Sequence, residues 1–598
     1  MTHAKTPASG LIIDDFLATA RQLSEHPALV SPVASVSYRQ LAGAVATASA
    51  ELERKGAERG TLVRLHGPVG APLIAYTLGA WQCGAVVWLD AAPDLRSGEE
   101  PSAEASLLSV TVGHDGEDVD IQTLHELPSA LAAAARQIPL HRAELIESGG
   151  GYLVRTSGST GRQKVILGDL RALSSFVAWQ RTEFDFSPDD RVAALTGVNF
   201  DVVYRDLFTT LTSGSTLLCA PPNLAPSRIL SWLRDSDASV LHVVPSLARY
   251  WLAASRRNGN GLTETPELRI TFFAGEPLDA QLAHEWRSRT GSAQEVVNLY
   301  GPSETTLAKF SYRVPQTLRS GAIPVGRPLP GTTVTITATD TGGSLPRGSV
   351  GEVVITTNQG SFGYLGDPVP EWADKFRRDG DLVTFQTGDL GSVRSEGLVL
   401  LGRLDSRLKI NGVWVNCHEV ETALRTHPAV KDAAVIGERV GPGIRLSAFV
   451  VLGEQIELHA LRSHVLQRLG RPSVPAIITQ TEQLPRLATG KVDRTSLRRL
   501  LNVSHGDSES VSLEPSRITL DDLVEHIAKS VQALLGTAVA TDGDLIDSGF
   551  DVTAAAQLCA VLEEELMVAC APEDVLAHPV PEQLGSLLLA RIHRATEK

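Results

Sequence analysis

The stretch RTSGSTGRQK, residues 155–164, carries the clearest chemical signal in the chain. Six of its ten residues are Ser, Thr or Gly. Glycine lets backbone amides approach an anion closely, and hydroxyl groups add hydrogen-bond donors. Arg162 and Lys164 add positive charge, but the G-x-x-x-x-G-K-[ST] spacing of a P-loop is absent. The stretch therefore predicts a loop that holds a polyphosphate, most simply ATP. Its composition alone is equally typical of a flexible surface loop.

Short apolar runs alternate with helical patterns on both sides of this loop. LVRLHGPV (62–69) and AVVWLD (85–90) have the pattern of buried strands, and residues 70–84 between them have apolar side chains at helical spacing. The strand pattern returns at 216–221, 240–245 and 269–275. Alternation of this kind predicts an α/β architecture with largely buried strands.

The pattern changes after about residue 400. A short helical pattern at 417–426 is followed by strand-like runs at 432–440 and 444–453, which predicts a small α+β domain. Residues 502–516 are polar and rich in serine, as in a linker, and the amphipathic segments beyond them predict a helical bundle. The expected organisation is a large α/β domain, a small α+β domain, a linker and an all-α domain at 11–403, 404–500, 501–518 and 519–595.

The composition excludes several classes of protein. The formal net charge of −15 argues against general binding to nucleic acid or anionic membranes, which requires basic patches. No signal-peptide pattern and no run of about 18 apolar residues occurs, so a cytoplasmic protein without a membrane span is expected. The five cysteines are scattered without a CxxC spacing, which favours reduced thiols over a disulfide framework or a zinc site.

The phosphate loop resembles the signature of adenylate-forming enzymes, in particular the adenylation domains of nonribosomal peptide synthetases. Five further stretches resemble motifs of these domains in the expected order. They are VSYRQL (36–41), NLYGPSETT (298–306), QTGDL (386–390), GRLDSRLKINGVWVNCHEVE (402–421) and LPRLATGKVDR (484–494). The resemblance implies a large α/β and a small α+β subdomain, ATP and Mg²⁺ as reactants, and an acyl-adenylate as the first product. In such a reaction an anion attacks a polyanion, so positioning and charge neutralisation are expected to dominate catalysis.

The resemblance assigns roles to individual residues. The loop residues that it implies for the β- and γ-phosphates are Thr156, Ser157, Gly158, Ser159, Thr160, Gly161 and Lys164. Tyr300, followed by Gly301, matches the aromatic residue that packs against adenine. Glu304 matches the acidic residue that holds Mg²⁺, which prefers hard oxygen ligands.

The other assigned roles concern the sugar, the carboxylate and the hinge. Asp389 matches the carboxylate that accepts hydrogen bonds from the ribose hydroxyls, and Arg403 matches an arginine that contacts the nucleotide. Asp405 matches the hinge at which the small subdomain rotates between the two half-reactions. Lys491 matches the lysine that reaches the substrate carboxylate and the α-phosphate. The expected catalytic residues are Lys491, Thr156, Lys164 and Glu304.

A further segment, FDVVYRDLF (200–208), resembles the start of the substrate pocket. Asp201 matches the aspartate that pairs with the α-ammonium group of an amino acid, and a buried carboxylate requires such a cation. The other lining positions implied by the resemblance are Val202, Arg205, His242, Phe272, Ala274, Leu299, Leu307 and Ala308. An arginine in a mostly apolar pocket favours a small polar or acidic substrate side chain. In the alternative, Arg205 points outward or pairs with Asp206.

The segment DLIDSGFDVTAAAQL (544–558) resembles the modification site of a peptidyl carrier domain, with Val552 at the position of the serine. Valine has no hydroxyl group, so no phosphopantetheine is expected on this chain. Thr553 would point about 100° away around a helix. The activated amino acid would then pass to a carrier protein in trans or to another acceptor. A small MbtH-like protein is a candidate partner. The alternatives are an acyl–coenzyme A ligase and a non-catalytic, degenerate synthetase module.

Overall fold

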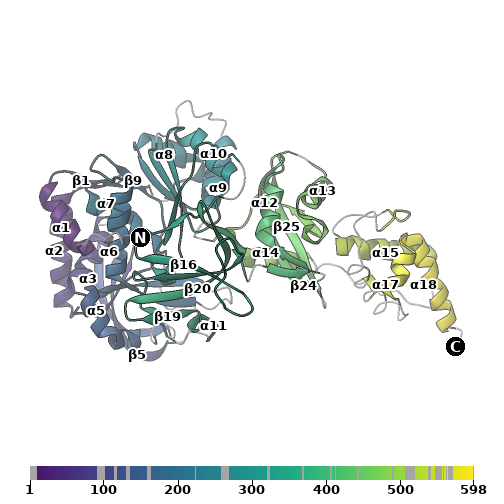
Figure 1. The fold of residues 1–598 in the computed structure, drawn as a ribbon, viewed down its shortest axis with the longest axis horizontal. Helices are drawn as coiled ribbons and strands as arrows, with labels where there is room; N and C mark the ends of the chain where they lie inside the picture. The colour runs from purple at the N-terminus through teal and green to yellow at the C-terminus, as the bar shows by residue number, and fades with distance from the viewer. Residues whose placement is uncertain are drawn as a thin grey trace. The chain divides into compact units, whose positions relative to one another are not determined.

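The computed structural model describes twenty-two segments of the chain (Figure 1). They are residues 10–90, 101–113, 118–128, 133, 135–157, 163–198, 200–221, 224–257, 268–319, 323–366, 370–404, 407–410, 413–440, 443–454, 456–487, 491–504, 519–535, 540–545, 555, 558–559, 562 and 570–596. Residues 133, 555 and 562 are single described positions. The chain divides into two compact units: Met1–Leu401 with Ala488–Lys491, and Gly402–Leu487 with Val492–Lys598. This division does not test the four predicted domain boundaries, which stay predictions.

The phosphate-loop stretch belongs to a seven-stranded sheet of the first unit. Its strands are, in spatial order, β18 (Gly363–Leu365), β8 (Gln163–Asp169), β7 (Gly151–Ser157), β4 (Val86–Asp90), β3 (Leu62–His66), β5 (Pro101–Val112) and β6 (Val119–Pro128). Strands β5, β3, β4 and β7 run parallel, whereas β7 and β8 form an antiparallel hairpin. The strands predicted at 62–69 and 85–90 are therefore confirmed as β3 and β4.

A nine-stranded sheet carries five further predicted positions, which are His242, Phe272, Ala274, Leu299 and Tyr300. Its strands are, in spatial order, β15 (Arg327–Pro328), β14 (Phe310–Arg313), β13 (Glu295–Tyr300), β12 (Ile270–Ala274), β11 (Val240–Val243), β9 (Arg191–Ala194), β10 (Thr216–Cys219), β1 (Pro27–Val30) and β2 (Ser35–Ser37). The strands from β13 to β1 are parallel. Because the carboxyl ends of parallel strands meet at one edge of a sheet, β11, β12 and β13 bring residues distant in sequence together there.

One large core joins these two sheets to five helices. The helices are α1 (Ile12–Gln22), α2 (Tyr38–Arg54), α3 (Ala71–Gln82), α6 (Leu170–Glu183) and α7 (Val202–Ser213). The sequence explains where α2 begins, since Ser37 and Gln40 form a reciprocal capping box. Helix α3 is buried along nearly its whole length, as its continuous apolar character requires.

A second core of the first unit lies under three further helices. These are α8 (Ile229–Asp235), α9 (Pro245–Arg257) and α10 (Ala280–Thr290), which Figure 1 shows grouped together. Trp286 packs there against Trp251 and against Phe273 of β12. An antiparallel sheet completes the unit with β16 (Thr332–Thr337), β17 (Gly351–Thr357), β20 (Leu382–Arg394), β19 (Phe376–Asp379) and β21 (Gly397–Arg403).

The second unit begins with the predicted small α+β fold. Strands β24 (Val430–Val440), β25 (Gly443–Leu452) and β26 (Ile477–Gln480) form a sheet, and β22 (Arg407–Ile410) pairs with β23 (Val413–Asn416). The helices are α12 (Cys417–Arg425), α13 (Leu458–Leu469) and α14 (Arg494–Ser504). Asn416 caps α12 by accepting a hydrogen bond from the backbone N–H of His418 at 3.0 Å. The strands and the helix predicted at 417–453 are confirmed.

The described part of the C-terminal segment is helical. It contains α15 (Leu520–Leu535), α17 (Pro572–Ala577) and α18 (Pro581–Thr596). Leu523, Ile527, Leu558, Leu584 and Leu588 share one apolar core. This arrangement agrees with the predicted helical bundle, although Val552 and Thr553 lie outside the described residues.

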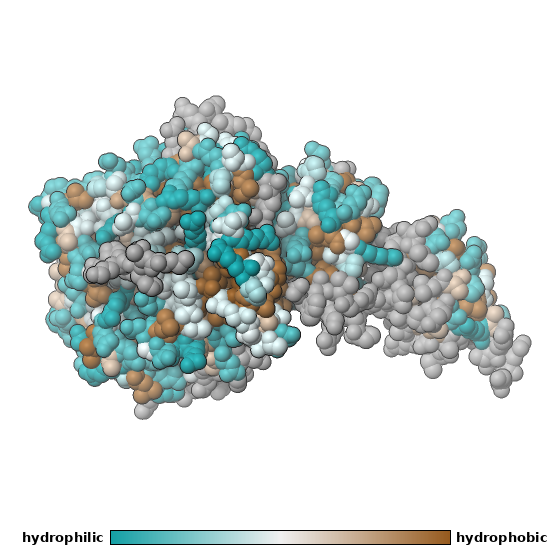
Figure 2. All heavy atoms as spheres, in the orientation of Figure 1, coloured by the Kyte–Doolittle hydropathy of each residue, from teal (hydrophilic) through white to brown (hydrophobic). Residues whose placement is uncertain are grey.

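On the face of the first unit that Figure 2 presents, hydrophilic residues predominate and hydrophobic ones form small groups. Among the residues that the structure describes, no helix combines the length and apolar character needed to cross a membrane.

Candidate functional site

The hairpin of β7 and β8 presents the ends of the predicted phosphate loop. Thr156 pairs with Lys164 and Ser157 with Gln163 in the antiparallel register. The tip, Gly158–Arg162, lies outside the described residues, as do the side chains of Thr156 and Ser157. The hairpin therefore brings the two ends of the motif side by side, with Lys164 on the strand that leaves the loop.

Lys164 lies in a polar and aromatic cluster with Glu304. Its Nζ is 3.4 Å from Glu304 Oε1, and the same oxygen accepts a hydrogen bond from the Tyr364 hydroxyl at 2.7 Å. The ammonium group also lies 5.5 Å from the ring centre of Tyr364 and 4.8 Å from that of Trp372. Such cation–π contacts favour a fixed position for the charge. Burial, with the nearby Glu304 carboxylate, raises the pKa of Tyr364 far above its ordinary value, so this phenol stays a donor.

Sequence reasoning missed Tyr364 and Trp372. Tyr364 lies on β18, where it pairs with Ile166 of β8 and so adjoins the strand that carries Lys164. This pairing joins segments that are about 200 residues apart, and no motif around either aromatic residue indicated it. The Glu304 carboxylate is thus anchored by two donors instead of lying free in solvent.

The loop that follows Glu304 is strained and tightly packed. Thr306 and Leu307 both have positive φ angles, 64° and 54°, which non-glycine residues adopt at an energetic cost. A Cβ on Gly301 would lie 2.2 Å from the Leu307 carbonyl oxygen, so only glycine allows this close approach. The backbone between Tyr300 and Ala308 is therefore held in one shape, which fixes Glu304 relative to Leu307 and Ala308.

Tyr300 and Asp389 meet although 89 residues separate them. The Tyr300 hydroxyl donates a hydrogen bond to Asp389 Oδ2. Asp389 lies on β20, and its backbone N–H donates to the Thr387 hydroxyl at 3.0 Å. The two residues to which the resemblance assigns the adenine and the ribose are thus neighbours.

The structure describes the predicted C-terminal lysine but not the predicted hinge residue. Asp405 lies outside the described residues, and Arg403 is exposed at the end of β21. Lys491 groups with the first unit, and its Nζ lies 3.6 Å from the place of a Cβ on Gly275, directly after β12. Lys491 is therefore brought to the carboxyl end of the parallel sheet.

Asp201 is half-buried immediately before α7. Burial raises the pKa of its carboxyl group, and a hydrogen bond with Ser303 and the charge of Arg205 oppose this rise. The negative charge of Glu304 also acts on it, so the two carboxylates lie near each other. A cationic group bound at Asp201 would relieve both the desolvation and this repulsion.

The structure brings the apolar positions of the predicted pocket together. They belong to the same core cluster, which the strand ends of β12 and β13, the start of α7 and the strained loop build jointly. These positions are Val202, Phe272, Ala274, Leu299, Leu307 and Ala308.

The two polar pocket residues take part in a buried network. Arg205 Nε donates to Asp206 Oδ1 at 3.0 Å, so the predicted alternative of pairing with Asp206 is correct. His242 Nδ1 lies 3.2 Å from the same oxygen, without the alignment of a hydrogen bond. Burial, followed by the charge of Arg205, lowers the pKa of His242 well below its ordinary value, which makes the imidazole neutral.

Gln180 determines which tautomer His242 adopts. The Gln180 Oε1 accepts from the Thr209 hydroxyl at 3.1 Å, so its amide nitrogen faces His242 Nε2, at 2.9 Å. Nε2 is therefore an acceptor, and the proton lies on Nδ1, toward Asp206. Both ring nitrogens of His242 therefore face protein groups, Nε2 toward Gln180 and Nδ1 toward Asp206. Sequence reasoning missed Gln180, which is fully buried on α6.

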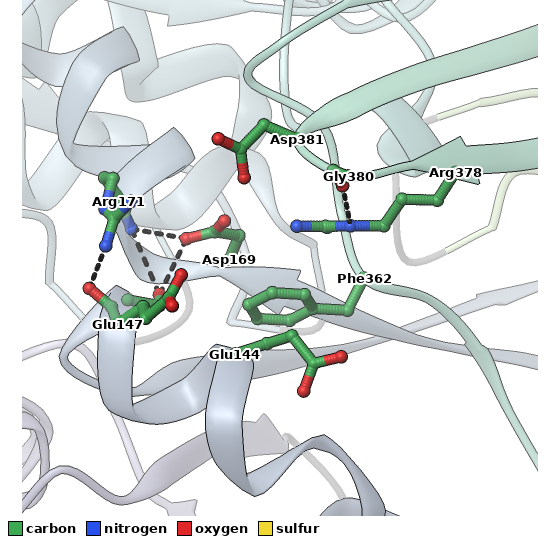
Figure 3. Close-up of a pocket in the computed structure, with 9 residues that line it drawn as sticks. Glu144, Glu147, Asp169, Arg171, Phe362, Arg378, Gly380 and Asp381 are labelled. Atoms are coloured by element: carbon green, nitrogen blue, oxygen red, sulfur yellow. Dashed lines mark hydrogen bonds between the residues drawn. The ribbon is translucent and has the colours of Figure 1, made fainter.

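A separate cavity of about 370 Å³ contains none of the predicted site residues (Figure 3). Arg378 lies over the ring of Phe362 at 4.6 Å and donates to the Gly380 and Ser361 carbonyl oxygens. Arg171 and Asp169 line the opposite side. Because the cavity contains none of the nominated residues, it is not the candidate site.

Three family models match the chain. The model of the AMP-binding enzyme matches residues 115–365, and that of the AMP-binding enzyme C-terminal domain matches residues 419–491. The model of the phosphopantetheine attachment site matches residues 525–588. The order of these matches supports an adenylation region followed by a carrier domain.

The similar proteins agree with this order of domains. An isonitrile lipopeptide synthase of Streptomyces coeruleorubidus is 29% identical over 97% of this chain and 40% of its own length. The structure of a four-domain nonribosomal peptide synthetase bound to AMP and glycine matches 98% of this chain and 43% of that chain, with 21% identity and a TM-score of 0.66. The anthranilate CoA ligase AuaEII matches 84% of this chain and 100% of that chain, with 22% identity and a TM-score of 0.67.

These matches differ in how much of the similar protein they cover and in what their identity can establish. The chain spans less than half the length of the two synthetases. At 21% and 22% identity the solved structures establish the fold, a large α/β domain followed by a small C-terminal domain. The predicted fold class is confirmed to that extent.

Proposed function

From this adenylation and carrier architecture, we propose that the chain activates an amino acid with ATP, releasing pyrophosphate and forming an aminoacyl-adenylate. The observation that carries the proposal is the cluster of Lys164, Glu304 and Tyr364 beside the phosphate-loop hairpin. An ammonium group and a carboxylate fixed together in this way suit a magnesium-bound polyphosphate. Neither group has another ionic partner among the described residues.

The reactants fit the residues present. Lys164 and the loop 156–161 would hold the β- and γ-phosphates, and Glu304 would hold Mg²⁺ through a hard oxygen ligand. When bound, Mg²⁺ supplies charge neutralisation at the phosphates. Tyr364 keeps the Glu304 oxygen oriented, and the aromatic rings of Tyr364 and Trp372 keep Lys164 in place.

Other residues would bind the nucleoside and the carboxylate of the substrate. The neighbouring side chains of Tyr300 and Asp389 would bind the adenine ring and the ribose hydroxyls. Arg403 would add a contact with the nucleotide, and Asp405 would serve as the hinge. Lys491, close to Gly275 at the end of β12, would place its ammonium group at the substrate carboxylate and the α-phosphate. Its charge would stabilise the transition state of the attack.

An amino-acid substrate is favoured by Asp201. Among the described residues its half-buried carboxylate has no full counter-charge, since Ser303 gives only a hydrogen bond and Arg205 is paired with Asp206. The α-ammonium group of an amino acid would supply the missing charge.

The substrate side chain would be small and polar, and uncharged in preference to anionic. The pair of Arg205 and Asp206 has no net charge, so an anionic side chain would find no unpaired cation there. Among the described residues no hydrogen bond involves the two Nη groups of Arg205. They would donate to a hydroxyl, amide or similar oxygen of the substrate.

The acceptor of the aminoacyl group would be a carrier protein in trans or another nucleophile. This part rests on Val552, which lies within the segment matched by the phosphopantetheine attachment-site model and has no hydroxyl group. A small MbtH-like protein remains a candidate partner.

The test is an amino-acid panel with ATP, Mg²⁺ and hydroxylamine, in which hydroxamate and pyrophosphate are measured. The proposal expects turnover with one small polar amino acid and weaker turnover with aspartate. The alternative function is an acyl–coenzyme A ligase, because the chain also matches the anthranilate CoA ligase. Parallel reactions with coenzyme A and with aryl acids test this alternative. Thioester formation from an acid without an amino group would overturn the amino-acid assignment, and no turnover even with an MbtH-like protein would favour a degenerate module.

A further inference from the structure

Two of the five cysteines lie side by side in the C-terminal segment. The Sγ atoms of Cys559 and Cys570 are 3.2 Å apart, and the two residues are separated by 11 positions in the chain. Both thiols are reduced and buried, with 3% and 4% of their surface exposed. A disulfide has a sulfur–sulfur distance of about 2.05 Å, so the two atoms need to approach by only about 1 Å.

This pair stands apart from the other cysteines. Cys83 contacts the hydroxyl of Ser49, and Cys219 and Cys417 are buried. In the part of the chain that the structure describes, no other two cysteine sulfurs are in contact. The scattered spacing that argued against a disulfide framework therefore concealed one close pair, because helix packing brings the two residues together.

A cation lies next to the pair. Arg591 of α18 binds Asp574 through two hydrogen bonds of 2.6 and 2.8 Å, and its guanidinium group also interacts electrostatically with both thiols. A positive charge near a thiol favours the thiolate, which is the nucleophile in thiol–disulfide exchange. Opening of the surrounding helices would expose the pair to a small reagent.

We propose that Cys559 and Cys570 form a dithiol site that reacts with a small-molecule disulfide and closes an intradomain disulfide. One thiolate attacks a sulfur of the reagent, forming a mixed disulfide and releasing the first small thiol. The second cysteine then attacks the protein sulfur of the mixed disulfide and displaces the second small thiol. Two electrons pass to the reagent, and the two protons of the cysteines end on its thiols.

The bond would join two elements of the helical segment. Cys559 and its neighbour Leu558 are helical, and Cys570 lies just before α17. A cross-link over 11 positions restricts the unfolded chain more than the folded one. Oxidation should therefore stabilise this segment, with little effect on the first unit.

The test uses the full chain equilibrated with mixtures of oxidised and reduced glutathione. Free thiols are then alkylated, and the denatured protein is cleaved after glutamate. Glu563, Glu564 and Glu565 lie between the two cysteines, so the fragments stay joined only if the disulfide has formed. We expect a joined pair of fragments that separates on reduction. Fully alkylated Cys559 and Cys570 in the most oxidising mixture, or glutathione left on either one, would overturn the proposal.

Variants provide the matched controls. Cys559→Ser and Cys570→Ser should each abolish the joined fragments, whereas Cys417→Ser should leave them unchanged. The thermal transition of the C-terminal segment should rise by several degrees on oxidation of the wild-type chain. An equal rise in Cys559→Ser would contradict the proposed bond. The wild-type mapping stays decisive even if a serine variant fails to fold.

Discussion

The ammonium group of Lys164 lies 3.4 Å from Oε1 of Glu304, although 140 residues separate them in the chain. Lys164 leaves the phosphate-loop hairpin, and Glu304 lies in the turn after β13. The structure thus joins the seven-stranded sheet and the nine-stranded sheet at the two residues that the resemblance assigns to phosphate and metal.

Lys164→Met should lower kcat/KM for amino-acid-dependent pyrophosphate release by roughly 100-fold, because a preorganised charge at the phosphates is lost. This loss is measured as the rate of pyrophosphate release with the amino acid of the panel that gives the highest turnover. Lys431→Met, at an exposed lysine of the second unit, is the control and should keep wild-type rates. A loss in Lys164→Met no larger than in this control would remove Lys164 from the phosphate site.

Tyr364→Phe should raise the Mg²⁺ concentration for half-maximal activity by about 10-fold, since the hydrogen bond that orients the Glu304 carboxylate is lost. The rate at saturating Mg²⁺ should recover to near the wild-type value. A Mg²⁺ titration of pyrophosphate release separates the two effects. A fall in the saturating rate with an unchanged Mg²⁺ requirement would contradict a role through Glu304.

Asp206→Asn should destabilise the first unit by about 3 kcal/mol or more, because it leaves Arg205 buried without its partner. Arg205→Met should also destabilise, and the double variant should lose less than the sum of the two. Thermal unfolding of the three variants gives this double-mutant cycle. Additive losses would show that the two side chains do not act as a pair.

The sequence predicted the strands β3 and β4, the helix α3 between them, and the helix and strands of the small α+β domain. Local periodicity determines these features, so they can be read from neighbouring residues. Motifs nominated candidate site residues within 155–164 and 298–306, and their roles stay predictions. The sequence left the partner of Arg205 undecided, because it is compatible with either orientation of this side chain.

Contacts between residues that are far apart in the chain could not be predicted from the sequence. Gln180 meets His242 across 62 residues, and Tyr364 meets Glu304 across 60. Neither Gln180 nor Tyr364 belongs to a recognised motif. The pair of Cys559 and Cys570 is close in sequence, but only helix packing decides that the two thiols face each other.

Lys309→Met should stabilise the first unit, and the gain should depend on pH. Lys309 is fully buried, and its Nζ has no hydrogen-bond partner among the described residues. Burial lowers the pKa of its ammonium group to about 7, from 10.5. The unfolded chain therefore holds the proton more tightly, and stability rises with pH between the two values.

The gain in Lys309→Met should reach about 5 kcal/mol below the folded pKa and shrink as the pH rises toward 10. Thermal unfolding of both proteins at about pH 6 and about pH 9 measures it, and titrations elsewhere cancel in the difference. A gain that is the same at both pH values would contradict a charge-burial cost at Lys309.

Val552→Ser should convert the C-terminal segment into a substrate for a phosphopantetheinyl transferase with coenzyme A. The transfer requires a hydroxyl group that attacks the diphosphate of coenzyme A, and valine has none. Intact-mass analysis should therefore show one added phosphopantetheine on Val552→Ser and none on the wild-type chain or on Val552→Ala. Addition to the wild-type chain at Thr553 would show that the reactive position had been misassigned. Addition to the serine variant alone would show that residue 552 is the modification position and that its side chain decides whether this segment can carry a phosphopantetheine arm.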